Sequence, residues 1–95
     1  MKFREKVFNT VKKIPEGKVA TYAQIAEMIN KPKAARAVGN ALNKNYDPKV
    51  PCHRVVHSDG SVGGFRKGTL AKVTKLKKEG IVIVNGRIEL GKYRF

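Results

Sequence analysis

The stretch TYAQIAEMINKPKAARAVGNAL, residues 21–42, holds two short helical patterns separated by a turn that contains proline. Thr21 stands three residues before Gln24, which is the spacing of a capping box, and predicts the N-terminus of a helix. Apolar residues recur at helical spacing after Thr21 and again from about residue 33 to residue 43. The sequence at residues 30–32 ends the first helix. Two short helices joined by a tight turn, on a basic chain, indicate a helix-turn-helix unit.

Helical patterns continue on both sides of this unit. Apolar residues at three- and four-residue spacing predict one helix over residues 3–14 and another over residues 69–79. In the second helix we expect an inward apolar face and a largely outward lysine face. The inward residues would be Leu70, Val73 and Leu76, and the outward ones Lys72, Lys75, Lys77 and Lys78.

The C-terminal part has the pattern of a β-hairpin. Residues 81–84 and 87–90 flank Asn85-Gly86, a pair that favours a type I′ turn. Residues 43–65 are rich in Pro, Gly and Asn and predict a long loop, which in so small a domain is usually functional. We therefore predict a mainly α fold: a winged helix-turn-helix-like single domain over residues 1–95, with a small C-terminal β-hairpin.

Charge is the strongest bulk feature of the chain. Lys and Arg number 21 against seven Asp and Glu, which gives a formal net charge of +14 on 95 residues. Such a surplus indicates a polyanionic partner, although a merely solubilising lysine surface is the alternative. There is no apolar stretch of transmembrane length and no signal core, so we expect a soluble intracellular protein that does not use a membrane.

Cys52 is the one cysteine, in the run Pro51-Cys52-His53-Arg54 within the predicted loop. It can form no internal disulfide and offers no zinc-binding set, so we expect no metal. Basic neighbours promote the nucleophilic thiolate form of a cysteine. The residues alone leave two interpretations open: a catalytic thiol with a histidine base oriented by one of the seven acids, or an inert buried thiol beside a solvent-facing histidine.

Several motifs, in order along the chain, resemble one family. The segment PCHRVV (51–56) is similar to the active-site signature of the methylated-DNA–protein-cysteine methyltransferases, also called alkylguanine-DNA alkyltransferases. Four further segments resemble the same family in register: GKVATYAQIA (17–26), KPKAARAVGNAL (31–42), SDGSVGGF (58–65) and LKKEG (76–80). The resemblance covers nearly the whole chain. Members commonly carry a domain before this one, which we expect to be absent here.

The resemblance implies a reaction without a cofactor. Cys52 would attack the alkyl carbon on O6 of guanine and keep the group, once per molecule. His53 would act through a water to deprotonate Cys52, with Glu79 orienting His53. Asn45 would hold the active-site turn; because the loop before Pro51 is one residue shorter than usual, Asn43 is the other candidate.

The resemblance also implies how DNA would be bound. A monomer would dock in the minor groove of double-stranded DNA containing O6-alkylguanine, in the cytoplasm at the nucleoid, and flip the damaged nucleotide out of the stack. Arg36 would replace the extruded base, and Tyr22 would crowd the phosphate of the flipped nucleotide. Main-chain groups at Cys52, Val55 and Arg66 would bond the base edge. Ala34 and Ala35 complete the expected DNA-binding set.

Two departures and two alternatives accompany this interpretation. Phe65 and Arg66 stand where the family often has a tyrosine and a small residue, so the width of the pocket is expected to differ. An alkyltransferase-like damage sensor is the first alternative, but such proteins lack the cysteine at the position of Cys52. A winged-helix regulator that reads undamaged DNA is the second.

Overall fold

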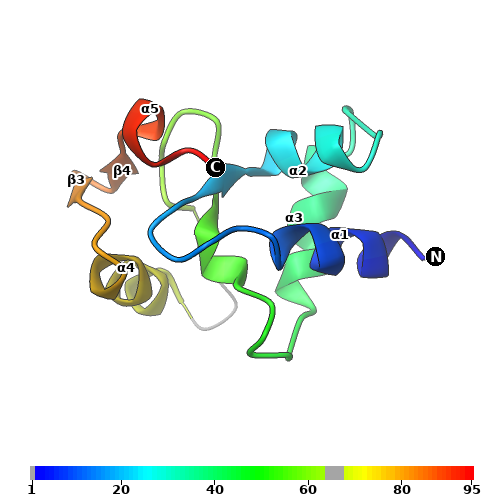
Figure 1. The fold of residues 1–95 in the computed structure, drawn as a ribbon, viewed down its shortest axis with the longest axis horizontal. Helices are drawn as coiled ribbons and strands as arrows, with labels where there is room; N and C mark the ends of the chain where they lie inside the picture. The colour runs from blue at the N-terminus through cyan, green and yellow to red at the C-terminus, as the bar shows by residue number, and fades with distance from the viewer. Residues whose placement is uncertain (1, 64–67) are drawn as a thin grey trace.

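Three helices form the N-terminal half of the domain. The computed structural model of the chain describes residues 2–63 and 68–95. Helices α1 (Phe3–Val11), α2 (Tyr22–Met28) and α3 (Ala35–Asn43) pack on one another at the end of the molecule where the chain begins (Figure 1). Their apolar faces enclose a core of valine, isoleucine, leucine and alanine side chains. The predicted mainly helical fold with a helix-turn-helix unit is confirmed.

The start of α2 shows which part of the capping prediction holds. Thr21 Oγ1 accepts a hydrogen bond from the backbone N–H of Gln24 at 3.0 Å, so Thr21 is the N-cap. The Gln24 side chain does not return to Thr21. Its Nε2 instead donates to the carbonyl oxygen of Phe95 at 2.6 Å, and its Oε1 accepts from Arg94 Nε at 3.2 Å. The second half of the expected capping box is therefore used to hold the C-terminal tail.

The helix predicted over residues 3–14 is shorter than expected. Helix α1 ends at Val11, and a turn follows in which the Ile14 N–H donates to the Val11 carbonyl. Ile14 is nevertheless buried in the core, which explains its helical spacing in the sequence.

The predicted loop between residues 43 and 65 contains regular structure that the sequence did not indicate. A 3₁₀ turn, η1 (Cys52–Arg54), leads directly into strand β2 (Val55–Val56). Strand β2 pairs in parallel with β1 (Ala20–Thr21), so that Ala20 lies opposite Val55. This short ribbon runs between the two halves of the molecule (Figure 1) and fixes the cysteine turn against the start of α2.

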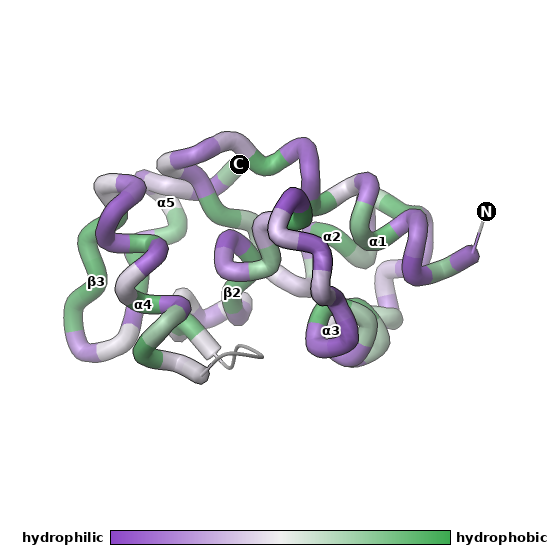
Figure 2. Tube along the Cα trace, turned by 90° about the horizontal axis from the view of Figure 1, so that it is seen from below, coloured by the Kyte–Doolittle hydropathy of each residue, from purple (hydrophilic) through white to green (hydrophobic). Residues whose placement is uncertain are grey.

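The C-terminal half encloses a second, smaller core. Helix α4 (Thr69–Lys78), strands β3 (Ile83–Val84) and β4 (Arg87–Ile88) and helix α5 (Leu90–Tyr93) surround it. Asn85 and Gly86 have φ angles of 52° and 73°, so the predicted type I′ hairpin is confirmed. Residue 90, expected in the second strand, instead begins α5. Figure 2 shows α4, β3 and α5 on one side of the molecule and α1, α2 and α3 on the other, with β2 between them.

Helix α4 corrects the prediction about its faces. Leu70, expected inward, is 80% exposed, whereas Lys72, expected outward, is fully buried. Lys72 and Leu76 lie one helical turn apart on the face that packs inward, and Leu70 lies in the first turn on the other side. The lysine can be buried because its Nζ donates to the carbonyl oxygen of Val55 at 2.7 Å. Among the described residues, no helix is long and apolar enough to cross a membrane.

Candidate active site

The thiol of Cys52 is half-buried at the first residue of η1. Asn45 Nδ2 donates to Cys52 Sγ at 3.0 Å, and the sulfur lies 3.9 Å from the carbonyl oxygen of Leu42. Asn45 also holds its own loop, because its Oδ1 accepts from the N–H of Asp47 and its Nδ2 donates to the Asp47 carbonyl. Asn43 is exposed, and its side chain lines a cavity beside α3 of which Cys52 is not a lining residue. Of the two asparagines left open by the sequence, Asn45 is the one in contact with the sulfur.

His53 is buried beside a carboxylate that is held from two directions. His53 Nε2 lies 2.8 Å from Glu79 Oε2, and Glu79 is the C-terminal cap of α4. Arg54 donates two hydrogen bonds to the same carboxylate, from Nε to Oε1 at 2.9 Å and from Nη2 to Oε2 at 2.7 Å. Arg54 Nη1 donates to the carbonyl oxygen of Ile14 at 2.8 Å. The histidine is therefore not solvent-facing, and Arg54 fixes the acid that orients it.

The electrostatics of this pair favour a neutral imidazole beside a charged carboxylate. Burial lowers the pKa of His53, and the opposing attraction of Glu79 does not restore it. Burial acts to raise the pKa of Glu79, but the hydrogen bonds from Arg54 and His53 outweigh it and hold that pKa below its ordinary value. A carboxylate can only accept, so Nε2 carries the hydrogen and Nδ1 keeps the lone pair of a base.

The surroundings of Cys52 favour the protonated thiol. Burial raises the pKa of Cys52, although the Asn45 hydrogen bond and the charge of Lys72 act in the opposite direction. Reactivity therefore requires a base that removes the proton as the sulfur attacks. In the described part of the chain the sulfur has no direct hydrogen bond to His53.

Lys72 belongs to this site, although the sequence interpretation missed it. Its Nζ lies 3.4 Å from the hydroxyl of Tyr22, in addition to the bond to Val55. Burial lowers the pKa of Lys72 to about 8, and the nearby Cys52 acts to raise it. Burial also raises the pKa of Tyr22, with a smaller contribution from Cys52. The one sequence signal was the four-residue spacing between Lys72 and Leu76, which places both on one helix face.

A cavity of about 380 Å³ opens between the start of α2, helix α3 and the residue after β2. Its lining residues are Tyr22, Ala35, Arg36, Gly39, Asn40, Asn43 and His57. Arg36 is exposed on α3, while Ala34 packs against the core instead. Val55 is buried in β2 with its carbonyl oxygen bonded to Lys72. Arg66 lies outside the described residues.

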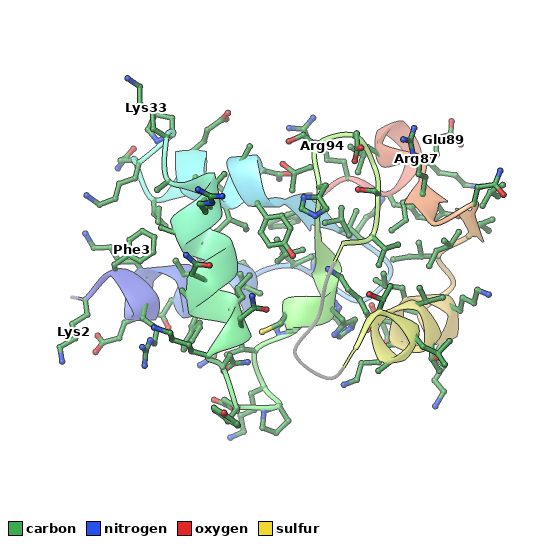
Figure 3. The ribbon with its side chains drawn as sticks, turned by 180° about the vertical axis from the view of Figure 1, so that it is seen from behind. Lys2, Phe3, Lys33, Arg87, Glu89 and Arg94 are labelled. Carbon is green, nitrogen blue, oxygen red and sulfur yellow. The ribbon has the colours of Figure 1, made fainter. Side chains whose placement is uncertain are left out.

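Basic side chains extend from both ends of the molecule. Figure 3 shows Lys2 and Lys33 at the end where the chain begins, Arg87 at the opposite end beside the hairpin, and Arg94 between the two ends. In residues 2–63 and 68–95, no group of three or more His, Cys, Asp or Glu side chains could hold a metal ion.

Comparison with known proteins gives consistent matches. Residues 2–81 match the family described as 6-O-methylguanine DNA methyltransferase, DNA binding domain. A bifunctional methyltransferase/endonuclease of Picrophilus torridus is 44% identical over 90 residues, which are 94% of this chain and 30% of that protein. A methylated-DNA–protein-cysteine methyltransferase of Methanosarcina acetivorans is 46% identical over 79 residues, which are 82% of this chain and 51% of that protein. The chain thus spans between 30% and 51% of the length of these relatives.

A solved structure matches more completely. It is S. pombe Atl1 in complex with damaged DNA containing O6-carboxymethylguanine. The TM-score is 0.90 at 33% sequence identity, and the match covers 98% of this chain and 94% of Atl1.

Proposed function

Because the chain belongs to the family of the 6-O-methylguanine DNA methyltransferase DNA-binding domain, we propose that it repairs DNA by moving an alkyl group from O6 of guanine to Cys52. The bond between the alkyl carbon and O6 breaks as the carbon–sulfur bond forms. The thiol proton leaves to a base, and the guanine anion takes up a proton. The thioether is stable, so each molecule acts once.

One observation carries this proposal: the Cys52 thiol and the His53–Glu79 pair occupy one 3₁₀ turn and the helix cap beside it. Nδ1 of His53 receives the thiol proton through a water. Glu79 then stabilises the imidazolium that forms, as carboxylates do beside histidine bases. Asn45 donates to the sulfur and so favours the developing thiolate.

The reactive carbon lies inside a duplex, so the damaged nucleotide must be flipped outward, at a cost of a few kcal/mol. Arg36 is exposed at the cavity on α3 and fills the space that the base leaves, where its flat guanidinium stacks on neighbouring bases. Tyr22 crowds the phosphate of the flipped nucleotide. Main-chain groups at Cys52, Val55 and Arg66 bond the base edge, with docking in the minor groove.

Arg36→Ala tests the flipping role. We expect the variant to slow repair more than it weakens binding to undamaged duplex, because only the flipped state uses the guanidinium. An unchanged repair rate would remove Arg36 from the mechanism.

A second candidate function is non-enzymatic recognition of the same lesion. The match to Atl1 over nearly the whole of both chains favours it. The presence of a thiol held by Asn45 favours transfer instead. A regulator of undamaged DNA is the third candidate, and it requires sequence-specific binding.

The experiment that separates these functions measures what happens to the lesion in the DNA. A duplex containing O6-methylguanine is incubated with excess protein, and the fraction of the lesion restored to guanine is measured beside a competing undamaged duplex. Transfer predicts restoration by the chain as it is and none by Cys52→Ala, which still prefers the damaged duplex. A sensor would prefer the damaged duplex without restoring it, and a regulator would show no preference.

A further inference from the structure

His57 is the histidine that the proposed chemistry does not use. It follows β2 directly, and its backbone is fixed in a tight turn. The His57 N–H donates to the Ser61 carbonyl, and the His57 carbonyl accepts from the N–H of Gly60, each at 3.0 Å. The side chain is exposed at the cavity beside α3. An exposed side chain on a rigid backbone can present its ring to a ligand without first being ordered.

The ring itself is confined on two sides. Its centroid lies 5.1 Å from that of Tyr22, with the ring planes tilted by 49°. On another side stands Gly63, whose φ is +75°, and a Cβ at that position would lie 2.6 Å from Cδ2 and Nε2 of His57. A side chain at residue 63 would therefore displace the imidazole. The glycine leaves the space that the ring occupies.

The cavity has the chemistry of an anion site. Its polar side chains include Arg36, Asn40 and Asn43, all of which carry N–H donors, and none of its lining residues in the described part of the chain has a carboxylate. Asp59, two residues from His57, does not line the cavity; its Oδ1 accepts from the Ser61 N–H at 2.9 Å and its Oδ2 lies 3.9 Å from Arg87 Nη2. A phosphodiester presents only acceptors and fits such a lining.

We propose that His57 is a nucleotide-binding residue, whose imidazole N–H donates to a DNA backbone phosphate that occupies this cavity, beside the nucleotide displaced toward Cys52. His57 and Tyr22 would form one wall of the phosphate site, and Arg36 lies on the helix across it. This inference rests on the proposed function, because it needs a displaced nucleotide. It adds a residue to which that proposal gives no role.

The test pairs protein variants with a modified DNA backbone. All proteins carry Cys52→Ala so that the lesion survives, and Kd is measured for a duplex with O6-methylguanine. His57→Ala removes the ring, whereas His57→Phe keeps a ring against Tyr22 without an N–H. Lys92→Ala removes a cation from α5 as a control. A neutral methylphosphonate replaces, one at a time, the two phosphates that flank the lesion.

We expect both His57 variants to bind the lesion duplex about fivefold more weakly, and Lys92→Ala to bind it as before. One of the two methylphosphonates should weaken binding by the same factor when His57 is present and have no effect in His57→Ala. If His57→Phe binds the lesion duplex as tightly as the protein with His57, the ring acts only by packing against Tyr22. If the effects of His57→Ala and of the methylphosphonate on Kd add fully, His57 does not contact that phosphate. Either result overturns the inference.

Failure of the proposed function has a different signature. The chain with Cys52 intact is assayed on the same duplex for methyl transfer. Transfer together with unchanged binding by both His57 variants would overturn the role of His57 alone. Equal affinity of the chain for damaged and undamaged duplex, without transfer, would overturn both.

Discussion

His53 Nε2 lies 2.8 Å from Glu79 Oε2, and Arg54 holds the same carboxylate through Nε and Nη2. Glu79→Gln keeps the size of the side chain and removes its charge. The charge orients His53 and stabilises the imidazolium, so we expect the single-turnover rate of methyl transfer to fall about 100-fold. Affinity for the lesion duplex should stay within about twofold of the original, because Glu79 contacts His53 and not the DNA.

Glu89→Gln is the matched control, since it removes the same charge at the exposed start of α5. It should leave the rate unchanged. Equal rates for Glu79→Gln and the unaltered chain would show that the ion pair is structural only.

Asn45 and Asn43 give a second prediction. Asn45→Ala removes the donor to Cys52 Sγ and the bonds across the Asp47 loop. Loss of the bond to the sulfur, worth about 1 kcal/mol, should slow transfer roughly fivefold and further raise the pKa of Cys52. A thiol-reactive probe read across pH measures that shift. Asn43→Ala should leave the thiol titration where it is; a shift in Asn43→Ala and none in Asn45→Ala would reverse the assignment.

The buried Lys72 makes stability depend on alkaline pH. Its pKa is about 8 in the folded protein against 10.5 ordinarily. Between these values the unfolded chain holds more protons, so the free energy of unfolding rises with pH across that window. Below about pH 8 both states are protonated and the cost of burying the charge is constant. Lys72→Met lacks the pH dependence that Lys72 causes. Cys52 and Tyr22 titrate in both proteins, so a comparison of the two isolates the effect of Lys72.

Urea unfolding of the unaltered chain and of Lys72→Met at several pH values measures the difference. From pH 8 to pH 10.5, the free energy of unfolding of the unaltered chain should rise relative to that of Lys72→Met by up to a few kcal/mol. A difference that stays flat over this range would mean that Lys72 keeps its ordinary pKa in the folded protein.

The features that the sequence predicted well depend on local backbone geometry. Asn85-Gly86 forms its hairpin turn because both residues tolerate positive φ, and Thr21 caps α2 because its hydroxyl reaches an N–H three residues away. The pairing of Glu79 with His53 could be anticipated only from the family resemblance, since 26 residues separate them. Their spacing alone left seven acids as candidates.

The features that the sequence missed depend on tertiary contacts. Lys72 is buried because the Val55 carbonyl and the Tyr22 hydroxyl meet its Nζ, and both belong to elements distant in the chain. Leu70 is exposed because no residue in the described part of the chain covers the first turn of α4 on its side. Neither outcome follows from the hydrophobicity of α4. The parallel pairing of β1 with β2 was missed for the same reason, as two-residue strands have no detectable period.

The central claim is that Cys52 accepts the alkyl group. The most direct test is the intact mass of the reduced protein after incubation with a duplex containing O6-methylguanine, at DNA concentrations that saturate binding. Our account predicts one added methyl group per molecule, located by fragmentation on Cys52, and no addition to Cys52→Ala. An unchanged mass at saturation, or a methyl group on any other residue, would contradict it.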